Sequence, residues 1–288
     1  MFSRISNSWE LVKASARVLQ ADKELLIFPI ISSLALILVS ISFFVPSLLS
    51  GLIDTMVLSG NQVLGALIGF AFYVTQYLVI TYFNTALVGA ALIRLRGGDP
   101  TVRDGFEVAN RNLFNIIGYA LIASTVGIIL RWLSERSNQL GRFVIGLVGM
   151  AWNLATFLAV PVLAAEGVGP IEAVKRSAQM LKKTWGEQIV GNFGLGAIFG
   201  IVYFLLIVLG IGGVVLLVLG GTPLWLIIPL ALAVIAMLVL VSLVNSTLQG
   251  IYTAALYQYA SGEAADIFFD NNIIEHAFRE KGTQRINL

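Results

Sequence analysis

Between Glu187 and Glu263 the chain contains no Lys, Arg, Asp, Glu or His. A helix that crosses a bilayer needs about 20 apolar residues, so this stretch is long enough for two crossings. Over all 288 residues, 58% are hydrophobic and 12% are charged, about half the charged fraction of a soluble domain. Such a composition leaves too little polar surface for a water-facing globule and predicts an integral membrane protein.

Apolar runs separated by charged breaks predict six membrane-spanning helices. The first is not a signal peptide, because an apolar run of about 24 residues is too long for that role. The predicted spans are Leu25–Leu49, Val63–Ile93, Leu113–Leu130, Phe143–Ala165, Ile189–Leu219 and Leu224–Tyr259.

Two of these spans are longer than a bilayer requires. A helix from Leu224 to Tyr259 would measure roughly 52 Å at 1.5 Å per residue, against a hydrocarbon core of about 30 Å. The second and sixth spans are therefore expected either to project from the membrane or to break near Gly89 and Gly250. Glycines from Gly210 onward predict a further helix break at the far interface.

The basic residues predict the orientation. With the N-terminus inside, all of the 18 Lys and Arg residues except Arg131, Arg136 and Arg142 lie on the cytoplasmic side. Basic residues resist translocation, so we expect a multi-pass protein of the cell (inner) membrane with both termini cytoplasmic. A net charge of +2 is too small to indicate nucleic acid as a partner.

A short amphipathic segment precedes each odd-numbered span. Glu10–Leu19 (ELVKASARVL) and Glu172–Leu181 (EAVKRSAQML) agree at six of ten positions, and Thr101–Leu113 is a more diverged copy. The pattern predicts an all-α bundle of three parallel repeats, each an amphipathic helix plus two spans, about a pseudo-threefold axis. The alternative is that the membrane interface selects similar surface helices.

The predicted domain organisation follows from these repeats. A six-span membrane domain covers residues 1–262, with repeats at about 1–98, 99–167 and 168–262, and residues 263–288 form a cytoplasmic tail.

Each even-numbered span carries an asparagine near its middle: Asn84, Asn153 and Asn245. An amide in hydrocarbon needs a hydrogen-bond partner. The three either form a shared polar cluster or solute site on the axis, or join helices by contacts of ~0.6 kcal/mol each.

Two further sets of residues suggest contacts with lipid or protein. Small residues four apart, such as Gly196 and Gly200, let helices approach closely within the chain or between chains. Basic residues of the first and third amphipathic segments either bind anionic lipid headgroups, at about 1 kcal/mol each, or only enforce topology. These basic residues are Lys13, Arg17, Lys175, Arg176, Lys182 and Lys183.

The chain offers little catalytic chemistry. It has no Cys and one His, His276 in the tail. The predicted spans contain no acid or base, so neither intramembrane proteolysis nor proton coupling is expected. The sequence predicts no enzyme, no metal and no cofactor; a lipid-modifying enzyme would need a metal at Asp99 or Asp104.

Three segments carry a resemblance to a known family. FSRISNSWELVKASARVLQADKELLIFPIISS at the start, VPVLAAEGVGPIEAVKRSAQMLKKTWGEQ from Val160, and FFDNNIIEHAFREK in the tail resemble an uncharacterised, mainly prokaryotic six-span membrane family. The chain is also similar, more loosely, to the membrane domain attached to some glycerophosphodiester phosphodiesterases. The resemblance implies a membrane domain without an assigned activity and carries no catalytic residues over.

The leading functional hypothesis is a non-enzymatic membrane module that assembles as a homo-oligomer or with another membrane protein. Its amphipathic helices would contact membrane lipids on the cytoplasmic face. The alternative is a passive channel or carrier for a small or amphiphilic solute that uses the three asparagines.

Overall fold

The structure is a computed structural model that describes residues 2–49, 62–185, 194–263 and 268–269. These residues form helices and turns without strands, and six helical stretches are long and apolar enough to cross a membrane. This confirms the predicted all-α polytopic bundle. The six stretches are Lys23–Leu49, Val63–Leu95, Leu113–Arg136, Gln139–Glu166, Ile198–Leu219 and Trp225–Ala260.

The described elements follow the order helix, span, span three times, as the predicted repeat requires. Whether the three units share an origin stays a prediction. The amphipathic helices are α1 (Phe2–Ala21), α5 (Val102–Arg111) and α9 (Pro170–Trp185). The first spans are α2 (Ile27–Leu49, after the short η1, Lys23–Leu26), α6 (Leu113–Arg136) and α10 (Gly194–Leu219). The second spans are α4 (Gln62–Leu95), α7 (Gln139–Thr156) with α8 (Ala159–Glu166), and α11 (Leu224–Ala260).

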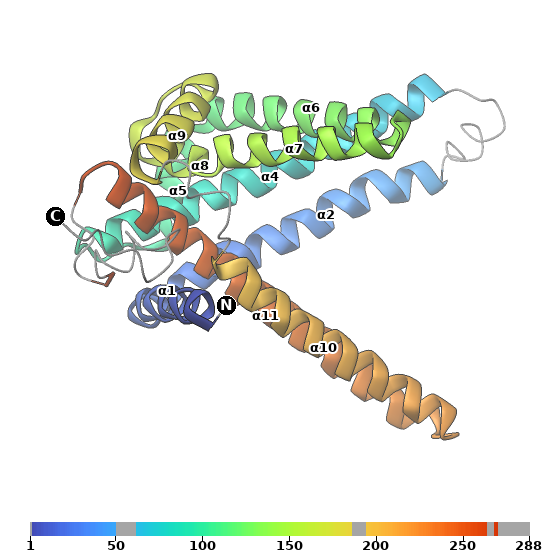
Figure 1. Cartoon of the computed structure of the whole chain (residues 1–288). Helices are drawn as coiled ribbons and strands as arrows, with labels where there is room; N and C mark the ends of the chain where they lie inside the picture. Colours follow the sequence, from blue (N-terminus) through green and yellow to red (C-terminus); the bar gives the residue numbers. More distant parts are fainter. Residues whose placement is uncertain (1, 50–61, 186–193, 264–267, 270–288) are drawn as a thin grey trace.

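The helices converge at one end of the molecule and diverge toward the other (Figure 1). We call the first the packed end; it holds α1, α5, α8, α9 and the C-terminal parts of α4 and α11. The opposite, splayed end holds the far ends of the six spans. There the α10–α11 hairpin points away from α2, α4, α6 and α7 (Figure 1).

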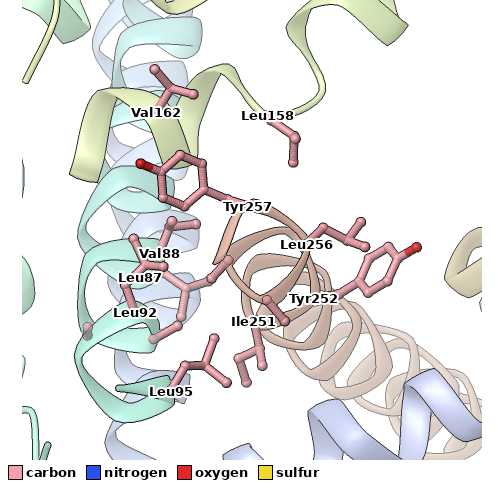
Figure 2. Packing of buried hydrophobic residues seen from close by; sticks show 14 of the residues in the cluster. Leu87, Val88, Leu92, Leu95, Leu158, Val162, Ile251, Tyr252, Leu256 and Tyr257 are labelled. Atoms are coloured by element: carbon pink, nitrogen blue, oxygen red, sulfur yellow. The ribbon is translucent and has the colours of Figure 1, made fainter. Parts of the chain in front are cut away.

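The buried core lies at the packed end. Side chains of α4, α8 and α11, among them Leu87, Val162 and Ile251, meet there at most 1% exposed (Figure 2). Burial of such a side chain contributes about 1.5–3 kcal/mol. The core therefore holds the three second spans together at this end.

Each amphipathic helix packs against a second span. α5 lies on α4, α9 lies on α7 and α8, and α1 lies on α11 and α10. On α1, Leu11, Ala14 and Val18 are buried, a spacing that places them on one face of a helix. Lys13 and Arg17 stay exposed. The three amphipathic helices thus brace the packed end from outside.

The long helices α4 and α11 run without a break for 34 and 37 residues. Of the two alternatives for these spans, the structure excludes breaks at Gly89 and Gly250 and shows helices longer than one bilayer thickness. Gly250 instead allows close packing, because a Cβ there would lie 2.4 Å from Leu87 Cδ2. α10 is also continuous through Gly210, and the chain turns at Gly221, whose φ is +70°.

The fourth predicted span is not one helix, because α7 ends at Thr156 and α8 begins at Ala159. Pro161 explains the break: it has no N–H to donate to the carbonyl four residues earlier, and its ring clashes there. The N–H of Leu158 donates instead to Ser177 Oγ on α9, at 2.9 Å. The start of the fifth predicted span at Ile189 lies outside the described residues.

Candidate functional site: a polar pocket among the spans

A pocket of about 200 Å³ lies between α2, α4 and α11. Its floor and walls include apolar side chains, among them Pro29, Phe83 and Leu243. Five polar residues from the three helices also line it: Ser32, Ser33, Asn84, Ser242 and Ser246. A cluster of this kind is unusual between membrane spans, where polar groups need partners.

A second pocket of about 170 Å³ lies between α4, the α7–α8 break and α11. Gln249, Thr253 and Pro161 line it, and it shares Asn84 and Ser246 with the first pocket. Asn84 and Ser246 therefore stand at the junction of two pockets, close to the contact between Gly250 and Leu87.

Some of the lining side chains are satisfied within their own helix. Ser33 Oγ donates to the carbonyl of Pro29 at 2.7 Å, and Thr253 Oγ1 donates to that of Gly250 at 3.0 Å. The Gln249 amide donates to Asn245 Oδ1 at 3.3 Å. Each bond uses one donor of these side chains within their own helices.

Four other lining side chains differ. Across the described part of the chain, those of Ser32, Asn84, Ser242 and Ser246 make no hydrogen bond. An amide offers two donors and an acceptor, and each hydroxyl both donates and accepts. No charged side chain lines either pocket. The arrangement is suited to an uncharged group that donates and accepts hydrogen bonds.

The structure does not bring the three predicted asparagines into one pocket. Asn84 is half-buried and lines both pockets; Asn153 is exposed and, like Asn245, lines neither. On α11 the residue that lines both pockets is Ser246, the next residue in the chain after Asn245. A joint role of the three asparagines stays a prediction.

The basic residues of α9 divide into two kinds. Lys175, Lys182 and Lys183 are exposed. Arg176 donates to Glu166, and to Glu172 at 3.1 Å, and these bonds raise the pKa of Arg176. Since Tyr257 of α11 also donates to Glu166 at 3.0 Å, Arg176 belongs to a bridge between α8, α9 and α11.

The basic residues of α1 lie apart from those of α9. Figure 1 shows the two helices on opposite sides of the packed end. Arg17 donates to the carbonyl of Phe268 at 3.1 Å, and Lys13 Nζ lies 5.7 Å from the centre of the Trp9 ring. The predicted lipid-binding residues thus form two separate groups, and their contact with lipid stays a prediction.

The two aspartates named for a metal are engaged otherwise. Asp99 pairs with Arg94 at 2.6 Å, and Asp104 Oδ2 accepts from the N–H of Thr101 at 2.7 Å. In the part of the chain that the structure describes, no three Asp, Glu or His side chains gather as metal ligands do.

Ser32 and Ser242 are pocket residues that the sequence did not indicate as part of a polar site. One sequence pattern points to Ser242: Ser242, Ser246 and Gly250 lie four residues apart, on one face of α11. The same spacing is typical of close helix packing, so it does not by itself indicate a pocket.

Comparison with known proteins gives a family and nothing further. The model of a family of unknown function (DUF6159) matches residues 63–266. Searches of curated proteins and of solved structures found no match.

Proposed function

The chain belongs to this family of unknown function (DUF6159), and we propose that it is a non-enzymatic membrane module that assembles with a second copy of itself. The α10–α11 hairpin is the assembling element. The packed end faces the cytoplasm, as the basic residues favour, and α1 and α9 lie at the lipid surface of the inner membrane.

One observation carries the proposal: two glycines of α10 have no close neighbour among the described residues. Gly196 and Gly200 lie four residues apart on one face, and within the described residues no atom lies within 4 Å of a Cβ built at either. Gly210 differs, because its Cβ would lie 2.6 Å from Val234 of α11. The hairpin is therefore joined through Gly210, while no described residue packs closely against Gly196 or Gly200.

Lipid favours pairing through such a face. Helices in a bilayer gain no hydrophobic energy by associating, and small residues stabilise pairs by letting backbones approach closely. A twofold dimer would use the same face of both copies. The Gly196–Gly200 face of one α10 is then expected against that of its partner.

Since the chain has no Cys, single cysteines report contacts without background. We expect Gly200→Cys to give a disulfide-linked dimer on oxidation in native membranes. The matched control is Gly146→Cys on α7, where a built Cβ also meets nothing within 4 Å, and we expect it to stay monomeric. Equal crosslinking of both variants, or none in either, would overturn the proposal.

A bulky substitution provides a second test. Gly200→Leu has room in the monomer, so we expect native mass spectrometry from nanodiscs to report loss of the dimer with unchanged thermal unfolding. A dimer that persists in Gly200→Leu would exclude this face.

A second candidate function, a passive carrier for a small or amphiphilic solute, is favoured by the pocket around Asn84 and Ser246. It differs from assembly in its site, which lies among α2, α4 and α11 of one chain.

A further inference from the structure

We infer that the pocket around Asn84 and Ser246 binds the uncharged, hydroxyl-bearing headgroup of a lipid such as a diacylglycerol, which enters sideways from the bilayer. The inference deepens the second candidate function by naming its ligand class. It rests on four features of the pocket: unused hydrogen-bonding groups, absence of charge, depth and access.

The serines of α2 show that the unused group at Ser32 is particular to the pocket. Ser40, Ser42 and Ser47 each donate to a backbone carbonyl of their own helix, at 2.6–2.8 Å. Ser32 makes no such bond in the described residues, although the same option exists for a helical serine. An unsatisfied polar group away from water is costly, so Ser32, Asn84 and Ser246 together favour a bound hydroxyl group.

The helices exclude a charged ligand. α2 and α11 carry no charged residue, and the only one in α4 is Arg94, near its end. A phosphate or ammonium group brought to Asn84 would lack a counter-charge in a low dielectric, which is far more costly than burying a hydroxyl. The pocket therefore selects lipids with neutral headgroups against phospholipids.

The depth of the pocket fits a headgroup without phosphate. Ser32 lies five residues after the start of α2 at Ile27, which places it roughly 7.5 Å along the helix. A glycerol hydroxyl group that lacks a phosphate can sit at this level, below the charged headgroups.

Access is from the lipid side. Ser242, which lines the pocket, is exposed. The helices α2 and α11 diverge toward the splayed end (Figure 1). Apolar side chains continue outward along both helices, with Ile37 55% and Val239 51% exposed. The headgroup would occupy the 200 Å³ pocket, while the acyl chains lie along these apolar surfaces.

Photolabelling of the full chain in phosphatidylcholine nanodiscs tests the inference. The probe is a diacylglycerol with a diazirine in one acyl chain. We expect Ser246→Ala to lower the labelling about fivefold, the effect of losing one hydrogen bond, and Asn84→Leu to lower it further. Ser42→Ala is the matched control, because its hydroxyl bonds its own helix outside the pocket, and its labelling should equal that of the wild type.

Competition tests the selection by charge. Unlabelled dioleoylglycerol should displace the probe, whereas dioleoylphosphatidic acid, with the same acyl chains and a charged headgroup, should not. Equal labelling of Ser246→Ala and Ser42→Ala, or equal competition by both lipids, would overturn the inference. These experiments measure binding and not flux. They therefore test the lipid site separately from the carrier function: a protein that binds the lipid but does not carry it would still be labelled.

Discussion

Glycine residues have different surroundings at the two ends of the molecule. At the packed end, a Cβ on Gly105 would lie 2.4 Å from Phe28 Cζ and 2.8 Å from the carbonyl oxygen of Ala86. On the far part of α10, within the described residues, a Cβ on Gly212 or Gly213 would meet nothing within 4 Å. Gly212 and Gly213 therefore lack the close backbone contact of Gly105, although Gly210 of the same helix meets Val234 of α11.

The difference between the two ends follows from their surroundings, which are water at the packed end and lipid along the spans. At the packed end, amphipathic helices can gain hydrophobic energy by covering the span ends, because their other faces meet water. Within a bilayer no such gain exists, since lipid is as apolar as leucine. Leu219, at the splayed end, is accordingly 78% exposed. The buried core lies at the packed end, and toward the splayed end the α10–α11 hairpin diverges from the other spans (Figure 1).

The largest effect is expected at an ion pair of the packed end. Asp22, 5% exposed, lies 3.5 Å from Arg94, which also binds Asp99. Arg94→Met would leave the Asp22 carboxylate unpaired, and breaking a buried pair in this way costs about 3 kcal/mol or more. Urea unfolding in detergent should report this loss. Arg96→Met is the control, because its pair with Glu263 is 45% and 42% exposed and contributes at most about 1 kcal/mol.

The loss in Arg94→Met should also depend on pH. Burial raises the pKa of Asp22, although Arg94 opposes the rise. A folded-state pKa above the unfolded value gives stability that is full at low pH and is lost as pH rises through the folded pKa. Removal of Arg94 raises that pKa further, so acidification should restore part of the stability. A loss that is the same at pH 4 and pH 7 would show that Asp22 is not the cause.

The next largest effect is that of replacing glycine by alanine, which should lower the stability at the packed end and raise it on α10. Gly105→Ala places a methyl group against the backbone of Ala86, and such overpacking costs about 1–3 kcal/mol. Gly213→Ala meets no neighbour in the described residues, so only the helix preference of Ala acts, which favours the variant by up to about 1 kcal/mol. Thermal unfolding of both variants in nanodiscs measures the signs. Equal signs would contradict the contrast between the ends.

The spans could be predicted because their signal is one-dimensional. Runs of about 20 apolar residues between charged breaks locate crossings without knowledge of any contact. Their continuity was harder to predict, since glycine suggests either a break or a close contact. Gly250 makes a contact with Leu87, and nothing in α11 alone reveals the approach of α4. Proline is no clearer a signal: the α7–α8 break lies just before Pro161, which has no N–H to donate, whereas α2 and α11 continue through Pro46 and Pro229.

The pocket depends on contacts that the sequence does not contain. Asn84, Asn153 and Asn245 hold similar places in their spans, but the α7–α8 break changes the path of the chain beside Asn153. Ser246 enters the pocket in place of Asn245 because of how α11 is turned against α4. In the sequence, nothing distinguishes Ser32 from the other serines of α2. In the structure it differs because, within the described residues, its hydroxyl makes no hydrogen bond to a backbone carbonyl.

The smallest effect on stability is expected from removing a helix N-cap at either end of the molecule. At the packed end, Thr101 Oγ1 accepts from the N–H of Asp104, and the Asp104 carboxylate accepts from the N–H and hydroxyl of Thr101. At the splayed end, Asn138 Oδ1 accepts from the N–H of Gly141 at 2.9 Å. Asn138→Ala should cost about 1 kcal/mol, and Asp104→Ala should also destabilise the protein.

The two caps should respond differently to acid. Hydrogen bonds from Thr101 lower the pKa of Asp104, so its contribution is present above the ordinary carboxyl pKa and is lost as pH falls through the folded-state value. The loss in Asp104→Ala should therefore shrink below about pH 4, whereas that in Asn138→Ala should not change, since an amide does not titrate. Thermal unfolding of both variants from pH 7 to pH 3 measures this difference. Parallel curves would mean that the Asp104 carboxylate does not stabilise the packed end through its charge.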